Sequence, residues 1–399
     1  MRRYDEDTAS AGRQVLPDLV RAWALFGICV VNVGVLAYPM ASSYHGGGLG
    51  TSADTAAFFL VNALFMMKSY SLFSFMFGVG FAYQIDSAER RGVGFAGRYW
   101  RRILGLLAFG ILNIALFFFG DILVIYAVLG AGLFLMKGLD WKNLRLIAII
   151  LYIVQIVLIA LFALAMWAGF TFAPEEMTEV TTKFTEMNKN AVAAFGEGTF
   201  VEAMMFRLIT YAESFSSMIM IQGVGAFSFF LFGLAAVKAG VISDPSAAIW
   251  RRARLIALPL GLLISGLGGY VTVQANGMID PNMFWGMLLI TIGSPFSSFG
   301  YIGLLAKWAE GSGGPIRNFF ARGGTSSLTA YLMQNAILSF TFAGYGLGYF
   351  AKWPAAHAIG FAALVALFTI AFTSIWRLFF SRGPLEYILR GITYAGAGR

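Results

Sequence analysis

The chain has 399 residues, of which 59% are hydrophobic and 12% are charged, with a mean hydropathy of +0.74 and a formal net charge of +8. Soluble domains of average composition carry about 25% charged residues, so this composition excludes an ordinary water-soluble protein. The basic residues lie at the ends of apolar segments rather than in one patch, so we expect no nucleic-acid partner. One cysteine, Cys29, and two histidines are too few for a disulfide or a Cys/His metal centre, so no metal is expected.

Ten apolar segments follow one another along the chain. A helix needs about 20 apolar residues to cross the hydrocarbon core, and most of these segments reach that length. The second is long enough to be tilted or broken around Lys68, and the fourth is the shortest. The predicted spans are 19–40, 55–85, 100–119, 121–136, 144–172, 213–237, 255–275, 283–308, 326–350 and 356–380.

Lysine and arginine residues alternate between the gaps that separate these spans. Cytoplasmic loops of membrane proteins carry an excess of Lys and Arg, so the alternation fixes an orientation. It predicts an all-α, polytopic transmembrane helix bundle of about ten spans with both termini in the cytoplasm. The gaps assigned to the cytoplasm contain Arg90, Arg91, Arg98, Arg101 and Arg102, then Lys137, Lys142 and Arg145, then Lys238, Arg251, Arg252 and Arg254, and then Lys307, Arg317 and Arg322.

This topology divides the chain into five parts. They are a cytoplasmic N-terminal segment (1–18), a first membrane half of about five helices (19–172), an extracytoplasmic loop (173–206), a second membrane half (207–382) and a cytoplasmic tail (383–399). The loop is rich in glutamate and has a helical pattern over 175–194. A loop of that length serves as a lid or plug in some proteins, and a solvated surface helix pair is the alternative interpretation.

A first group of polar residues lies toward the cytoplasmic side: Asp18, Arg21, Lys68, Arg377 and Glu386. Charges within a membrane are costly and commonly mark a site or an internal pair. Asp18 and Arg21 are three residues apart on one helix face, where they can pair. One interpretation is that Asp18 caps the helix and Arg21 reaches the headgroups. The other is that Arg21, with Arg377 or Lys68, holds an anionic group, and Arg377 with Glu386 is an alternative structural pair.

A second group lies toward the outer side: Asn32, His45, Asn113 and Asp121. A histidine beside a carboxylate is the minimal general-base arrangement. Asp121 opens the fourth span, where the helix dipole favours a carboxylate. The alternatives are that His45 is an ordinary loop residue and that the two asparagines only hydrogen-bond between helices.

The eighth and ninth spans are unusually polar. Pro295 lies among glycine and serine residues in the middle of the eighth, which indicates a kink that exposes backbone groups to a cavity. The ninth is too polar to face lipid. An enzyme and a transporter would both need such a cavity, which we expect to be lined by Ser294, Ser297, Tyr331, Gln334 and Asn335.

Six ordered blocks of sequence carry a family resemblance. They are LPDLVRAWALFGI at 16–28 with Val31 and Asn32, LFSFMFGVG at 72–80, GDILVIYA at 120–127, SPF at 294–296 with Gly300 and Tyr301, LTAYLMQ at 328–334, and GPLEYILR at 383–390. On these blocks the chain is identified as a member of the bacterial DUF418/YeiB family of membrane proteins, over almost its full length. The second membrane half is the DUF418-like part.

The resemblance implies a protein of the cytoplasmic membrane, grouped with transmembrane acyltransferases such as heparan-α-glucosaminide N-acetyltransferase-like proteins. Those relatives take an acyl group from cytoplasmic acyl-CoA and deliver it across the membrane, with a histidine after the first helix as the catalytic residue. His45 is the position to which that role transfers. The chain departs from the family pattern in having Ala22 for the opening glycine, Asn113 where relatives often carry histidine, and Ala330 for an asparagine.

Two hypotheses therefore stand. In the first, the chain is an acyltransferase. Arg21 with Lys68 or Arg377 binds acyl-CoA as donor, His45 oriented by Asp121 deprotonates the acceptor, and Asn32 or Asn113 stabilises the oxyanion. In the second, the same charges bind an anionic or lipid-like solute for transport without chemistry. Either hypothesis places a multi-pass protein in the bacterial inner membrane with lipids and a small-molecule or lipid substrate as partners, and leaves a homo-oligomer open.

Overall fold

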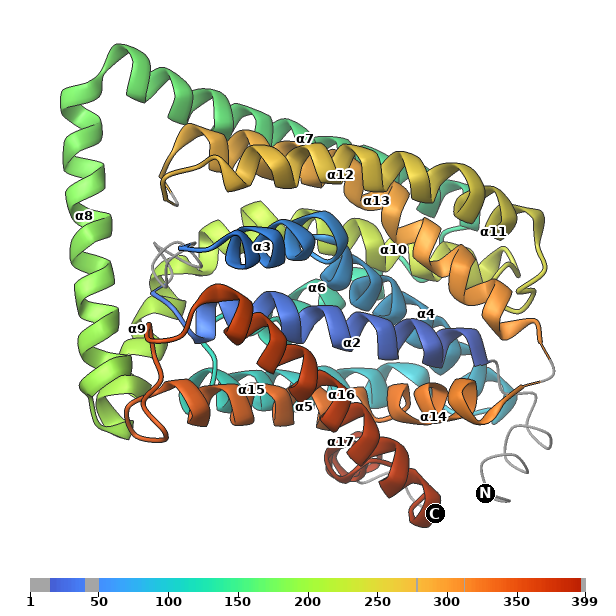
Figure 1. Ribbon diagram of the computed structural model, residues 1–399. Helices are drawn as coiled ribbons and strands as arrows, with labels where there is room; N and C mark the ends of the chain where they lie inside the picture. The colour runs from blue at the N-terminus through green and yellow to red at the C-terminus, as the bar shows by residue number, and fades with distance from the viewer. Residues whose placement is uncertain (1–14, 40–49, 278, 312, 396–399) are drawn as a thin grey trace.

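The computed structural model describes residues 15–39, 50–277, 279–311 and 313–395, and within these ranges the regular secondary structure is entirely helical (Figure 1). The predicted all-α class is therefore confirmed. The first membrane half contains α2 (Val15–Leu36), α3 (Ser52–Leu64), α4 (Lys68–Arg90), α5 (Phe95–Leu116), α6 (Leu123–Leu135) and α7 (Trp141–Phe172). The remainder contains α8 (Pro174–Val192), α9 (Phe200–Met218), α10 (Val224–Lys238), α11 (Ala248–Arg252), α12 (Leu258–Val273), α13 (Pro281–Ala309), α14 (Pro315–Gly324), α15 (Ser327–Phe342), α16 (Ala355–Phe379) and α17 (Pro384–Tyr394).

Most of the predicted spans correspond to long apolar helices. In the described residues, eight helical segments are long and apolar enough to cross a membrane. The fourth predicted span is α6, which has only 13 residues. The ninth corresponds to α15, and α14 lies in residues that were predicted as a cytoplasmic gap. The polytopic helical bundle is thus confirmed, and about ten passes fit it, while the cytoplasmic placement of both termini remains a prediction.

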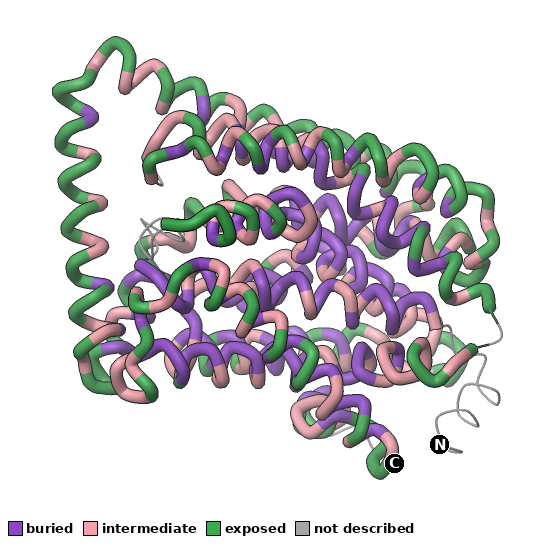
Figure 2. The backbone as a smooth tube through the Cα atoms, viewed as in Figure 1, coloured by how far each residue is buried: buried purple, intermediate pink, exposed green. Residues whose placement is uncertain are grey.

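The outer surface of the bundle is apolar. Exposed side chains on α7 and α12 are large and hydrophobic, and the outward sides of these helices appear as exposed residues in Figure 2. Soluble monomers rarely present apolar patches larger than a few hundred Å², so this surface belongs in lipid. The exposed residues include Leu146, Ile150, Ile153, Val157 and Leu161 on α7 and Leu263 and Leu267 on α12. The core lies between α2, α4, α10 and α13, around buried Phe75 and Phe229.

Two spans are broken within the bundle. The second is interrupted between α3 and α4, where Met67 has a left-handed φ of 64°, so the predicted break around Lys68 is confirmed. The ninth predicted span begins at a second break, which separates α14 from α15 at Thr325 and Ser326. The prediction that it continues to residue 350 was wrong: α15 ends at Phe342, and the chain then turns, because glycine-rich sequence such as Gly348 (φ 72°) does not sustain a helix.

The long loop is mostly helical. α8 runs across the end of the bundle, from the end of α7 toward the start of α9 (Figure 1). Its described residues are largely exposed, with Met177 and Ala191 as the buried contacts. Residues 200–206, predicted as loop, belong to α9, because Thr199 and Glu202 form a capping box that starts this helix.

Candidate active site

A cavity of about 320 Å³ lies among α2, α4, α5, α6, α15 and α17. Four arginines line it, Arg21, Arg102, Arg382 and Arg390, and the carboxylate among its lining residues is Glu386. We call it the arginine cavity. In the predicted topology these arginines lie toward the cytoplasm, where a soluble anion would enter. Its apolar lining includes Phe73, Met76, Phe77, Leu106, Leu123, Leu328 and Leu389.

Arg21 reaches the cavity from α2. Its Nη1 donates to Asp18 Oδ1 at 2.9 Å, so the pairing predicted from their spacing is confirmed. A Cβ placed on Gly80 of α4 would lie 3.9 Å from Arg21 Nη2. Because glycine has no side chain, α4 leaves room for the guanidinium at the cavity wall. Arg21 is therefore oriented by one carboxylate and still lines the cavity.

Arg102 reaches the cavity from α5, and sequence reasoning did not single it out among the five basic residues of its gap. It shares a helix face with Leu106, one turn further along, which also lines the cavity. Its Nε is buried and has no hydrogen-bond partner in the described structure. Buried donors are nearly always satisfied, and an exception calls for a water, an ion or a functional role.

Glu386 links α17 to the start of α15. Its Oε1 accepts hydrogen bonds from the backbone N–H groups of Leu328 (2.8 Å) and Thr329 (3.2 Å). Its Oε2 accepts a hydrogen bond from Thr329 Oγ1 at 2.6 Å. A carboxylate at this position satisfies free N–H groups and complements the helix dipole. Glu386 therefore caps α15 from a different helix.

The far end of α17 is also fixed. Arg101 Nε donates to the carbonyl oxygen of Thr393 at 3.0 Å. The ring of Tyr394 lies within cation–π distance of two guanidinium groups, Arg98 at 5.0 Å and Arg390 at 4.5 Å. α17 is thus held at both ends while its residues form one wall of the cavity.

Tyr331 connects the cavity to a buried polar network. Its ring lines the cavity, and its hydroxyl donates to Asp121 Oδ2 at 3.4 Å. Asn113 Nδ2 donates to the same oxygen at 2.7 Å, and Asn335 Nδ2 donates to Asn113 Oδ1 at 3.4 Å. These four residues, the Asp121 network, are all at most 1% exposed. The structure therefore brings together residues that the sequence placed in two separate predicted groups.

Asp121 is fully used as an acceptor. Besides the two side-chain donors, its Oδ1 accepts from the N–H groups of Leu123 at 2.7 Å and Val124 at 3.1 Å. It thereby caps α6, as the sequence indicated. The four hydrogen bonds occupy both carboxylate oxygens, so the geometry suits Asp121 to orient Tyr331 and Asn113.

Comparison with known proteins decides the family. The family model "Protein of unknown function (DUF418)" matches residues 236–396, which include the α17 wall of the cavity. Uncharacterized protein YxaH of Bacillus subtilis (strain 168) is 29% identical over 94% of this chain and 93% of its own length. Uncharacterized protein YeiB of Escherichia coli (strain K12) is 24% identical over 97% of both chains.

The C-terminal part of this chain, residues 236–396, matches the DUF418 family. A shorter match, 37% identical over 113 residues, covers 28% of the chain and 31% of an uncharacterized 39.9 kDa protein in the amylase 3′ region of Bacillus acidopullulyticus. No protein of solved structure matches. The family assignment predicted from the sequence blocks is confirmed, and these names assign no activity.

Two predicted donor-site residues lie away from the arginine cavity. Lys68 is completely buried, and its Nζ donates to the carbonyl oxygens of Asn62 (3.1 Å) and Met66 (3.2 Å) at the end of α3. Arg377 Nε donates to Thr325 Oγ1 at 2.9 Å, beside the break before α15. Both cations therefore satisfy groups at broken helices, and neither lines the cavity.

The predicted outer residues are only partly brought together. Asn32 is half-buried on α2, and within the described structure it makes no hydrogen bond to the Asp121 network. His45 lies outside the described residues. Within the described ranges no group of three His, Cys, Asp or Glu side chains could hold a metal ion.

The remaining predicted cavity residues hold helices together. Ser294 Oγ is 3.5 Å from Ser71 Oγ, and Gln334 Nε2 donates to Thr369 Oγ1 at 3.0 Å. Ser297 packs against α12, where a Cβ on Gly261 would lie only 2.3 Å from the Ser297 nitrogen. Close helix contacts through small residues are typical of membrane bundles. α13 continues through Pro295, and these three residues do not line the arginine cavity.

Arg207 is a buried cation on α9, ahead of the sixth predicted span. It is 1% exposed, and its Nε and Nη2 donate to the carbonyl oxygen of Ala115 near the end of α5. Its guanidinium lies 5.6–5.8 Å from the ring centroids of Phe195, Phe200 and Tyr345. No local signal in the sequence distinguishes it from an exposed loop arginine, because its partners are distant along the chain.

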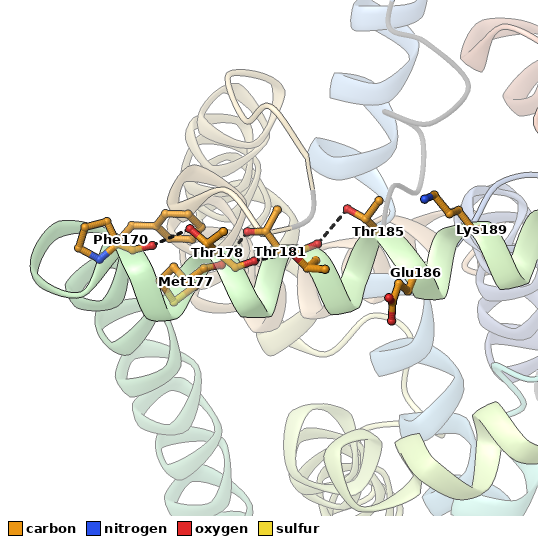
Figure 3. Close-up of a pocket in the computed structure, with 9 residues that line it drawn as sticks. Phe170, Met177, Thr178, Thr181, Thr185, Glu186 and Lys189 are labelled. Carbon is orange, nitrogen blue, oxygen red and sulfur yellow. Dashed lines mark hydrogen bonds between the residues drawn. The ribbon is translucent and has the colours of Figure 1, made fainter.

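A second cavity, also of about 320 Å³, lies along α8 (Figure 3). Its threonine hydroxyls donate to backbone carbonyls four residues earlier, as Thr178, Thr181 and Thr185 do at 2.8–3.0 Å. These donors are therefore already engaged, and Lys189 is the one cation among the lining residues. This cavity offers less to an anionic ligand than the arginine cavity does.

Proposed function

We propose that this protein is an acyltransferase of the bacterial cytoplasmic membrane that takes an acyl group from an acyl-CoA-type donor on the cytoplasmic side. The acceptor would lie on the extracytoplasmic side. The observation that supports the proposal is the arginine cavity, in which four guanidinium groups surround one carboxylate that already caps α15. Such a surplus of positive charge favours an anionic ligand.

The apolar lining supports the same class of donor. Phe73, Met76, Phe77 and Leu106 lie in the same cavity as the arginines. An acyl thioester has an apolar chain and a strongly anionic end, so it matches both kinds of lining. Ligand sites in proteins commonly combine an apolar wall with a few polar anchors.

The transfer step assigns roles that stay close to the sequence prediction. The acceptor hydroxyl or amine attacks the thioester carbonyl carbon, the C–S bond breaks, and the thiol of coenzyme A leaves. The proposed base that takes the acceptor's proton is His45. Asp121 acts as a positioning residue through Tyr331, since its oxygens already accept four hydrogen bonds.

Binding of acetyl-CoA to the purified, detergent-solubilised protein tests the donor site. We expect saturable binding that is lost in Arg21→Ala and kept in Arg91→Ala, because Arg91 is exposed and does not line the cavity. Absence of binding by the intact protein to any acyl-CoA would reject the acyltransferase proposal.

Replacement of the proposed base tests the chemistry separately. His45→Ala should abolish transfer while leaving acetyl-CoA binding and the thermal unfolding midpoint unchanged, since a general base contributes about 10²- to 10⁴-fold to the rate. Transfer at the normal rate in this variant would reject His45 as the base.

Transport of an anionic or lipid-like solute is a second candidate, and one observation favours it. Two spans are broken within the bundle, at Met67 and at Thr325–Ser326. Discontinuous helices form the substrate sites of many secondary transporters. Uptake of acetyl-CoA or coenzyme A into proteoliposomes, without any change to the compound, would favour transport over acyl transfer.

A further inference from the structure

We propose that Arg21 and Arg102 form a two-arginine clamp for a phosphate group, so that the ligand of the arginine cavity is a phosphate-bearing amphiphile. This inference deepens the proposed function and rests on it only for the identity of the donor. The clamp joins α2 to α5, two helices whose cavity residues are far apart in sequence.

The first observation is the unsatisfied donor on Arg102. Its Nε is buried and has no hydrogen-bond partner among the described residues, although the side chain borders the cavity. Leaving such a donor unpaired is unfavourable. An oxygen atom of a ligand beside Arg102 would accept a hydrogen bond from this Nε–H group.

The second observation is an unbalanced positive charge. Arg21 and Arg102 lie close enough for their like charges to interact, and Glu386 is within electrostatic range of Arg102. Asp18 pairs with Arg21, but Glu386 is committed to the N–H groups of α15. With Arg382 and Arg390, the cavity has four guanidinium groups against these two carboxylates, so a dianionic group would balance the surplus positive charge.

The geometry of the donors favours phosphate over a carboxylate. A guanidinium is a planar fork that binds two oxygens side by side. A carboxylate has two oxygens in one plane, so a single fork can align with both of them. A terminal phosphate presents three oxygens around a tetrahedral centre, so it can accept from two arginines that approach from different helices.

The apolar surroundings indicate the rest of the ligand. Phe77 and Leu106 line the same cavity as the two arginines, and Leu106 lies one turn from Arg102. A fully hydrated ion such as free phosphate gains nothing from these side chains, whereas an amphiphile buries apolar surface there. Two sources supply that chemistry: a thioester carrier with phosphorylated ends and a phospholipid headgroup.

The experiment compares two soluble probes on the full-length protein in detergent. Coenzyme A carries phosphates and an adenosine, and pantetheine is the same thiol without either, so the dependence on Arg102 isolates the phosphate contribution. We expect coenzyme A to bind about 100-fold more tightly, the size of effect typical of two hydrogen bonds to charged groups. In Arg102→Gln that preference should fall to less than about threefold, whereas Arg91→Gln, a matched charge loss at an exposed position just after α4, should keep it.

Further variants and a lipid probe separate the outcomes. Arg102→Lys keeps the charge but not the fork, so the preference should be intermediate. Equal binding of coenzyme A and pantetheine, or equal effects of Arg102→Gln and Arg91→Gln, would overturn the clamp and leave the acyl-donor proposal standing. If coenzyme A does not bind but phosphatidic acid in nanodiscs binds in an Arg102-dependent manner, the clamp holds for a headgroup and the acyl-CoA proposal falls. Unchanged thermal unfolding midpoints show that the variants are folded.

Discussion

The two broken spans use buried charge in opposite ways. At the end of α3, Lys68 donates to the free carbonyls of Asn62 and Met66. At the start of α15, Glu386 accepts from the free N–H groups of Leu328 and Thr329. Each charge complements the partial charge of the helix end that it meets. The breaks differ in that Lys68 is completely enclosed, whereas Glu386 lines the arginine cavity.

The comparison shows that a charge within the membrane is not in itself a binding site. Arg207 donates to a backbone carbonyl near the end of α5, and Asp121 accepts from a backbone N–H at the start of α6. Asp54 Oδ1 accepts from the N–H of Ala356 at the start of α16. Helix ends leave backbone groups that lipid cannot satisfy. The charges that remain informative about function are those that border a cavity as well.

Replacement of Lys68 should have the largest effect on stability. Lys68→Met leaves two buried carbonyl groups without a donor, and each such group costs about 1–3 kcal/mol. We therefore expect a large loss of folded protein and a lower thermal unfolding midpoint in detergent, with acetyl-CoA affinity unchanged in the fraction that folds. Lys142→Met, at an exposed position, is the control. A selective loss of affinity in Lys68→Met would show that the two breaks are functionally alike.

Replacement of Glu386 should have a smaller effect on stability and a second effect on binding. Glu386→Gln keeps an acceptor but loses the charge that complements the α15 dipole, at a cost of about 1 kcal/mol. Because a negative charge leaves the cavity, coenzyme A should bind about threefold more tightly. Titration of coenzyme A and a thermal unfolding curve measure both. Weaker binding in this variant would mean that α17 must be held by Glu386 for the cavity to exist.

Removal of the Tyr331 hydroxyl should change stability least. Its hydrogen bond to Asp121 is long, at 3.4 Å, so Tyr331→Phe should cost no more than about 0.5–1 kcal/mol. Coenzyme A affinity should stay within about twofold, because the hydroxyl bonds to Asp121 and not to an arginine. A slower transfer rate with unchanged donor affinity would show that the Asp121 network acts in the transfer step and not in donor binding. An equal loss of transfer rate and donor affinity would show that the network and the arginine cavity act together.

Much of the fold was readable from local sequence. Hydropathy and the alternation of basic residues located the spans, a three-residue spacing predicted the Asp18–Arg21 pair, and the polar interruption at Lys68 predicted a broken helix. Each of these follows from residues close together in the chain. Helix ends were less certain, because capping by Thr199 or turns at Gly348 shift them by several residues.

The candidate site was readable only in part, because its contacts join distant residues. Tyr331 and Asp121 are 210 positions apart, and Glu386 is 58 positions from Leu328. Arg102 looked like any other cytoplasmic arginine, and Arg207 like a loop residue, until their surroundings were known. A burial pattern set by tertiary packing has no local signature in one sequence.

The position of α17 also bears on how the protein is made. α17 follows the membrane spans in the chain, yet it supplies Glu386, Leu389 and Arg390 to the wall of the arginine cavity. During synthesis, the earlier helices can insert into the membrane before this wall exists. The cavity is therefore completed last, so a chain stopped before Pro384 would be inserted in the membrane and still have no enclosed ligand site.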